Sequence, residues 1–147
     1  MSPFSNSIRI QHSRIGRVFP KIHYPNFELE TIKAPLTHGF DINFKPDWFE
    51  QLELIRLQMS KVEFDIALIS AGAYSYPLAL HAKKMGKIGI HTGGGLQLFF
   101  GILGKRWEPK YPETTNYLSN YINGYWVRPS AEETPENSKM IENGCYW

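Results

Sequence analysis

The feature that most constrains the fold is a strand–helix–strand pattern between residues 64 and 91. Two short and almost continuously apolar segments, 64–70 and 87–91, are typical of strands that are covered on both faces of a parallel sheet. Residues 76–85 between them predict a helix that ends at Gly86, a residue suited to a C-terminal cap. The pattern spans about 28 residues, the length of one βαβ unit with parallel strands.

Two further segments extend this pattern toward the N-terminus. Residues 46–62 predict a helix, because Pro46 and Asp47 suit its first turn. This helix carries one apolar stripe, formed by Trp48, Leu52, Ile55 and Met59. Residues 27–34 alternate in part between apolar and polar side chains and end at Pro35, which predicts another strand. We therefore expect an α/β fold with a Rossmann-like parallel sheet and flanking helices.

The length of 147 residues fits a single α/β domain. Its βαβ-type core is expected over residues 1–106, with an N-terminal helix over 5–19 that Gly16 weakens by about 1 kcal/mol relative to alanine. Residues 107–147 are rich in proline and in aromatic side chains, and one short helix is predicted there, over 114–122. We expect an irregular, aromatic-rich C-terminal tail that wraps the sheet.

Composition excludes several classes of protein. Sixteen Lys and Arg residues against 14 Asp and Glu give a net charge of +2, so no nucleic acid is expected as partner. Cys145 is the only cysteine, which excludes a disulfide within the chain and a thiolate metal cage. The first residues lack the pattern of a signal peptide, and no apolar run approaches the roughly 20 residues of a transmembrane helix. A cytoplasmic location and no transmembrane segment are expected.

Two glycine-containing turns follow the predicted strands, at 70–74 and 91–97. Ligands of open α/β sheets bind beyond the carboxyl ends of the strands, and small residues let backbone N–H groups approach a ligand. The candidate binding residues in these turns are Gly72, Ala73, Tyr74, Thr92, Gly93, Gly94, Gly95 and Gln97. The alternative explanation for the small residues in these turns is tight packing of the chain, and this explanation is favoured for Gly72. Neither turn matches the dinucleotide-binding or P-loop pattern, which disfavours classical NAD binding and P-loop NTPase activity.

Charged and aromatic residues near these turns supply further candidates. Lys105 and Arg106 can neutralise a phosphate, Trp107 can stack on a base or sugar, and Arg128 is a weaker candidate of the same kind. The alternative interpretation of the same residues is a solvent-exposed basic turn, Lys105 and Arg106, beside a tryptophan that packs in the core. His91 is the one histidine that ends a predicted strand at the ligand edge, and it is the candidate catalytic residue. No histidine shows metal-ligand spacing, so no metal site is predicted within the chain.

Several runs of residues, spread over nearly the whole chain, carry a family resemblance. They are 2–4, 27–33, 65–74 (DIALISAGAY), 86–94 (GKIGIHTGG), 97–107 (QLFFGILGKRW), 126–130 and 144–147. They resemble a group of mostly uncharacterised bacterial proteins that occur among polysaccharide-assembly genes. That group in turn is similar to the GT-D fold glycosyltransferases, mainly in the βαβ core.

The resemblance implies a hexosyltransferase-type glycosyltransferase of surface polysaccharide assembly, with a nucleotide-sugar donor and a glycan acceptor. Relative to that group the chain begins at the turn of Pro3 and Phe4, so we expect an N-terminal strand and its acidic Asp-x-Glu motif to be absent. A divalent metal is then expected only if an acidic motif comes from outside this chain. In the second turn, His91 and glycines 93–95 replace the acidic residues of GT-D enzymes.

A missing first strand also leaves an unpaired sheet edge, which a partner chain or a second copy would cover. The alternative function, from a different class, is a non-catalytic binding or scaffold domain of a polysaccharide-assembly system. In that case the aromatic tail is the contact surface.

Overall fold

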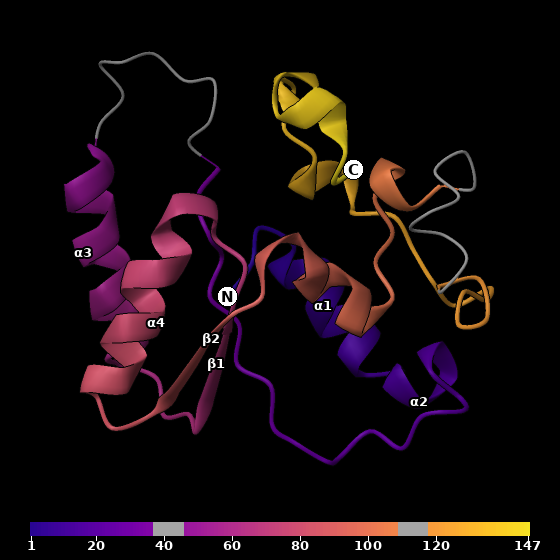
Figure 1. Ribbon diagram of the computed structural model, residues 1–147, viewed down its shortest axis with the longest axis horizontal. Helices are drawn as coiled ribbons and strands as arrows, with labels where there is room; N and C mark the ends of the chain where they lie inside the picture. Colours follow the sequence, from indigo (N-terminus) through magenta and orange to yellow (C-terminus); the bar gives the residue numbers. More distant parts are fainter. Residues whose placement is uncertain (37–45, 109–117) are drawn as a thin grey trace. The chain divides into compact units, whose positions relative to one another are not determined.

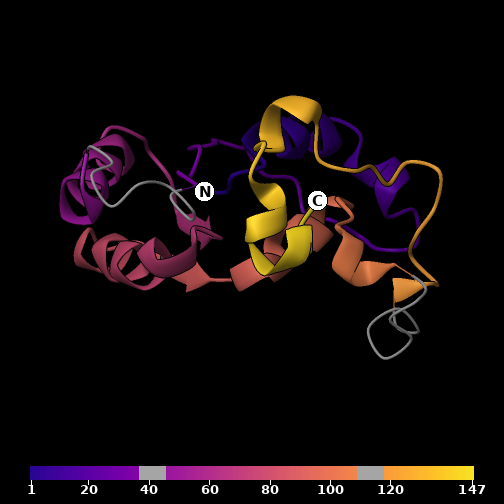
Figure 2. The ribbon, with the colours of Figure 1, turned by 90° about the horizontal axis from the view of Figure 1, so that it is seen from above.

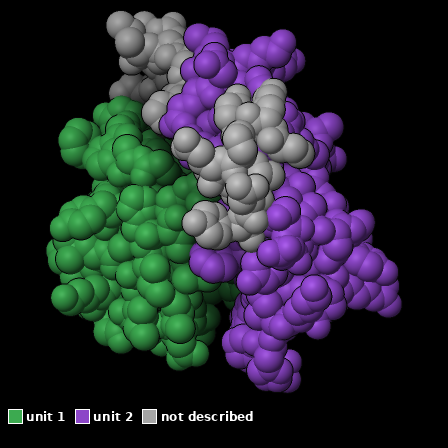
Figure 3. All heavy atoms as spheres, turned by 45° about the vertical axis from the view of Figure 1, so that its right-hand side comes forward, with its two compact units in different colours: residues 1–5, 30–96 green, residues 6–29, 97–147 purple. Residues whose placement is uncertain are grey.

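The chain folds into two compact units. The structure, a computed structural model, describes residues 1–36, 46–108 and 118–147. Unit 1 comprises residues 1–5 and 30–96, and unit 2 comprises residues 6–29 and 97–147 (Figure 3).

Unit 1 contains the predicted strand–helix–strand pattern (Figure 1). Strand β1 (Ile66–Ile69) is followed by the short 3₁₀ helix η1 (Gly72–Tyr74), helix α4 (Ser75–Lys84) and strand β2 (Ile88–His91). The two strands pair in parallel, with Ile69 opposite His91. The predicted order and the parallel pairing are confirmed for this pattern, with slightly shorter elements. The larger Rossmann-like sheet stays a prediction, because the described strands form a sheet of two.

Helix α3 (Trp48–Met59) precedes β1 and is also confirmed, although Pro46 lies outside it. It begins with a capping box, in which Asp47 Oδ1 accepts from the Glu50 amide and Glu50 Oε2 accepts from the Asp47 amide, both at 2.9 Å. Helices α3 and α4 pack side by side (Figure 1 and Figure 2). The hydrophobic core of unit 1 consists of Ala34, Leu52, Ile55, Met59, Ile69, Ala71, Tyr74, Leu78 and Ala82.

Among the described residues, the two faces of the two-stranded sheet are covered unequally. On the more covered face, Gly89 approaches α4 so closely that an added Cβ atom would lie 2.4 Å from the carbonyl oxygen of Ala79. On the other face Ile66 pairs with Ile88, and these side chains are 53% and 55% exposed. The expectation that both strands are buried on both faces is therefore wrong, because about half of each of these isoleucine side chains is open to solvent.

The strand predicted over residues 27–34 does not form. Only Lys33 makes an isolated parallel bridge, with Ser2, through Ser2 N–H to Ile32 O at 3.2 Å and Ala34 N–H to Ser2 O at 3.0 Å. Met1 in turn accepts from the Ser70 amide at 2.9 Å, so the first residues of the chain lie beside the end of β1. The partial alternation in 27–34 predicted a half-buried strand. This prediction is wrong because Phe27, Glu28 and Glu30 are all exposed, so the segment has no buried apolar face there.

In unit 2 the helix predicted over 5–19 is broken in two. Helix α1 (Ser5–His12) and helix α2 (Ile15–Val18) are separated at Arg14, whose φ of −130° and ψ of 25° are not helical. The rest of the unit is irregular, with short 3₁₀ helices η2 (Gly93–Phe100, which begins in unit 1), η3 (Lys105–Trp107), η4 (Ala131–Glu133), η5 (Ser138–Met140) and η6 (Glu142–Gly144). The helix predicted over 114–122 falls mostly outside the described residues, and whether the tail wraps the sheet stays a prediction.

A buried carboxylate holds the start of α1. Glu133 accepts hydrogen bonds from the Asn6 amide at 2.7 Å, from the Ser7 amide at 3.2 Å and from the Ser7 hydroxyl. The Ser130 hydroxyl donates to the same carboxylate at 3.3 Å. Because the first N–H groups of a helix have no acceptor within it, this side chain ties residues 130–133 to the N-terminus of α1.

Candidate functional site

The two glycine turns start side by side at one edge of unit 1. Ile69 and His91, the last residues of β1 and β2, are opposite each other in the parallel register. Both the amide and the hydroxyl of Thr92 donate to Ile69 O, at 2.9 and 3.0 Å. We call residues 70–74 and 91–95 the carboxyl edge, since the carboxyl ends of both strands lead into it.

In the first turn, Gly72 and Ala73 are exposed and Tyr74 is buried. Gly72 has a φ of +53°, which favours glycine over residues with a side chain. The Tyr74 ring stacks on Trp48, with centroids 5.2 Å apart and planes 11° apart. Of the three candidates here, Gly72 and Ala73 present their backbone to solvent, whereas Tyr74 is a packing residue whose ring faces the core.

In the second turn, His91 is exposed and lies close to the glycines. Gly93 has a φ of +56°, and a Cβ atom added there would lie 4.0 Å from Nε2 of His91. A Cβ atom added to Gly95 would meet nothing within 4 Å, so this turn borders open space. The imidazole of His91 is therefore accessible beside this turn, and its catalytic role stays a prediction.

Exposed aromatic side chains at the start of α3 were missed by the sequence reasoning. Trp48 was assigned to the buried stripe, yet it is exposed at the same end of unit 1 as Tyr74, and Phe49 beside it is 72% exposed. Figure 1 shows α3 and α4 beginning at the same end of unit 1. The available signal was the pair itself, because adjacent residues of a helix point about 100° apart, so that Phe49 lies at the margin of the stripe that contains Trp48.

The remaining candidates lie in unit 2, where two of them are buried. Gln97 is 1% exposed, and its Nε2 donates to Ile102 O and to Tyr146 O, both at 3.2 Å. Trp107 is also buried. These two side chains therefore pack inside unit 2, and their predicted contact with a ligand stays a prediction.

The basic candidates of unit 2 are engaged with the C-terminal segment. Arg106 forms an ion pair with Glu142, and its guanidinium carbon lies 4.8 Å from the centroid of the Tyr146 ring. Lys105 Nζ donates to Asn143 O at 3.4 Å. Arg128 pairs with Glu108 at 2.8 Å. A role of Lys105, Arg106 and Arg128 in binding phosphate would have to compete with these partners, and it stays a prediction.

Cys145 lies beside this ion pair, and its environment keeps the thiol protonated. Burial raises the pKa of the Cys145 thiol, and the hydrogen bond that it donates to Glu142 Oε2 at 3.3 Å raises this pKa further. The nearby Arg106 guanidinium acts in the opposite direction. We expect Cys145 to react slowly with iodoacetamide near pH 8, because the thiolate is the nucleophile.

Substitutions around the thiol should change this rate in opposite directions. Glu142→Gln is expected to speed alkylation, since it removes the charge that disfavours the thiolate, and Arg106→Gln is expected to slow it. Glu28→Gln, an exposed position outside the cluster, serves as control. Alkylation rates followed by intact-mass spectrometry measure the effect, and slower reaction of Glu142→Gln would contradict this environment of the thiol.

Across residues 1–36, 46–108 and 118–147, no group of three or more His, Cys, Asp or Glu side chains is arranged to hold a metal ion. Among the helices described, none has the length and apolar character to cross a membrane. No protein-family model matches the chain, and neither a curated protein nor a solved structure matches it. The functional assignment therefore depends on the geometry of the carboxyl edge and on the sequence motifs.

Proposed function

We propose that unit 1 is a glycosyltransferase-like, Rossmann-like domain that binds a nucleotide-sugar at the carboxyl edge. The observation that carries this proposal is the parallel register of β1 and β2, which starts both glycine turns side by side. Ligands of α/β sheets bind at this edge, in the crevice beyond the strand ends. Exposed backbone at Gly72 and open space at Gly95 leave room for a bulky anionic ligand.

Two kinds of side chain at this edge suit glycosyl transfer. His91 can take the proton of an acceptor hydroxyl, since its ring is exposed beside the second turn. Phe49, which is 72% exposed, offers an aromatic surface on which a base or a sugar can stack, whereas one face of Trp48 is already covered by Tyr74. The resemblance to polysaccharide-locus proteins adds the reaction class, hexosyl transfer to a glycan acceptor, and a place in surface polysaccharide assembly.

Calorimetric titration of the full chain with UDP, GDP, ADP and CDP tests donor binding. We expect one of these nucleotides to bind and Gly72→Ala to weaken it at least fivefold, because a side chain at this positive φ would shift the turn. Gly86→Ala is the matched control: Gly86 also has a positive φ, of +76°, but it follows the C-terminal end of α4. Absence of heat with every nucleotide, or equal losses for both variants, would contradict the proposal.

The catalytic role of His91 is tested separately, with the nucleotide-sugar of the nucleoside diphosphate that binds. His91→Ala should leave the affinity for that nucleotide within about twofold but lower the transfer rate by roughly 100-fold or more, the usual contribution of a general base. His23→Ala is the control, because His23 is an exposed histidine outside the carboxyl edge. Unchanged transfer by His91→Ala would exclude His91 as the base.

The non-catalytic binding or scaffold domain is favoured by a different observation, the exposed isoleucine face of the sheet. Ile66 and Ile88 there would suit a protein partner. The aromatic tail is a less suitable contact surface at Trp126, which is buried with its Nε1 donating to Val18 O at 3.2 Å. In this case Ile88→Lys would abolish biological activity, whereas His91→Ala would leave it unchanged.

A further inference from the structure

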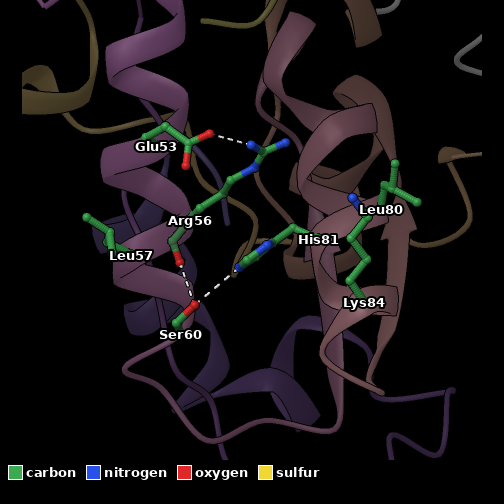
Figure 4. Close-up of a pocket in the computed structure, with 7 residues that line it drawn as sticks. All are labelled: Glu53, Arg56, Leu57, Ser60, Leu80, His81 and Lys84. Atoms are coloured by element: carbon green, nitrogen blue, oxygen red, sulfur yellow. Dashed lines mark hydrogen bonds and ion pairs between the residues drawn. The ribbon is translucent and has the colours of Figure 1, made fainter.

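The groove between α3 and α4 has a chemistry that the carboxyl edge does not explain. It is lined by Glu53, Arg56, Leu57, Ser60, Leu80, His81 and Lys84, and its volume is about 230 Å³ (Figure 4). We call this set the α3–α4 groove. All of these residues belong to unit 1, and several lie in the C-terminal parts of their helices, away from the start of α3 at Trp48.

The groove carries an excess of positive charge. Arg56 and Lys84 face a single carboxylate, Glu53, which pairs with Arg56. None of the ion pairs among the described residues involves Lys84. A guanidinium has five N–H donors, and Glu53 Oε1 is the acceptor of one of them. The Nε of Arg56 is buried and has no hydrogen-bond partner in the described part of the chain, so the donors that a ligand in the groove can reach are the terminal N–H groups of Arg56 and the ammonium of Lys84. The groove therefore has more hydrogen-bond donors and more positive charge than the single carboxylate of Glu53 can satisfy.

The hydrogen bond between Ser60 and His81 gives a further donor. The Ser60 hydroxyl donates its only proton to Arg56 O at 3.0 Å. His81 Nε2, 3.2 Å from the same oxygen, must then be the donor in that contact. This direction excludes Ser60 as a nucleophile activated by His81 in the observed arrangement.

We propose that the α3–α4 groove binds a phosphate group, either free or as a small phosphate monoester. A phosphate group near neutral pH carries about 1.5 to two negative charges and several acceptor oxygens, and it therefore matches Arg56, Lys84 and His81 better than a single carboxylate does. The volume of about 230 Å³, against roughly 30 Å³ for a water molecule in the liquid, exceeds what a bare phosphate fills. Leu57 and Leu80 offer apolar surface to the organic part of an ester.

Titration of the full chain with inorganic phosphate and with phenyl phosphate tests the site, by calorimetry and by amide chemical shifts of α3 and α4. We expect saturable binding with the largest shifts near residues 56–60 and 81–84. Tighter binding of phenyl phosphate would identify an ester as the ligand, and equal binding would identify free phosphate. No saturation with either compound, or shifts confined to the carboxyl edge, would overturn the proposal.

Charge substitutions make the test specific. Lys84→Gln should weaken binding about two- to fivefold, and Glu53→Gln should strengthen it by a similar factor, because it removes the competing carboxylate. Lys83→Gln is the matched control, since Lys83 is an exposed neighbour on α4 that does not line the groove. Gly72→Ala, which changes the carboxyl edge, should also leave phosphate binding unchanged. Equal weakening by Lys83→Gln and Lys84→Gln, or weakening by Glu53→Gln, would contradict the site.

Discussion

Gly89→Ala is expected to lower the free energy of unfolding of unit 1 by about 3 kcal/mol, the upper range for overpacking a tight contact. A Cβ atom at this position would lie 2.4 Å from the carbonyl oxygen of Ala79 and 2.8 Å from its Cα. Both are backbone atoms of α4, so rotation of a side chain cannot relieve the clash. Helix α4 would have to move away from β2, and the turns that both elements hold in place would move with it.

Hydrogen exchange of the α4 amides and thermal unfolding by circular dichroism measure this loss. Gly95→Ala is the control in the same unit, because a Cβ atom there meets nothing within 4 Å, and it should change stability by less than about 0.5 kcal/mol. The exchange of α1 amides in unit 2 reports whether the effect stays local. A Gly89→Ala protein that melts like the wild type would show that α4 does not press on β2.

Glu133→Ala is the substitution with the largest expected effect in unit 2, a loss of about 2–4 kcal/mol. The estimate combines the loss of a helix N-cap with the burial of donors that no longer have an acceptor. The affected donors are the amides of Asn6 and Ser7 and the hydroxyls of Ser7 and Ser130. Because Glu133 is itself only 3% exposed, water cannot readily replace the carboxylate.

Glu132→Ala is the natural control, since this neighbour is exposed and has the same charge. It should leave the melting temperature nearly unchanged, whereas Glu133→Ala should also remove the exchange protection of the α1 amides. Glu133→Gln should fall between the two, because its amide keeps one acceptor oxygen but points a donor at the N–H groups of α1. Equal effects of Glu132→Ala and Glu133→Ala would mean that the carboxylate does not hold α1.

The parts of the fold that could be predicted from sequence are those with local signals. The βαβ pattern at 64–91 is continuous in sequence. Helix α3 is predicted by its apolar stripe and by the cap at Asp47. The segment 27–34 failed because alternation does not tell whether a neighbouring strand exists. Its one ladder contact is with Ser2, about 30 residues away, and no local pattern encodes that pairing.

In the candidate site, too, only features with a local sequence signal could be predicted. The turns at Gly72 and Gly93 were found because a glycine after a buried strand is a local signal, and both have positive φ. Gln97 was grouped with them by proximity alone, and its burial against Tyr146 O depends on a residue far along the chain. The partner of Arg106, Glu142, is equally distant in sequence. Sequence spacing therefore predicts the position of a turn, but it does not predict which distant residues a side chain contacts.

The sheet with one open face imposes opposite evolutionary constraints on neighbouring residues. Ile69 and Gly89 face the packed side, where almost any replacement removes contacts or creates a clash. Ile66 and Ile88, on the other side of the same strands, are about half exposed, so threonine there should cost the folded unit less than a replacement of Ile69 or Gly89. Related sequences should therefore vary more at positions 66 and 88 than at positions 69 and 89. Isoleucine retained at the open positions would be the mark of selection by something other than folding.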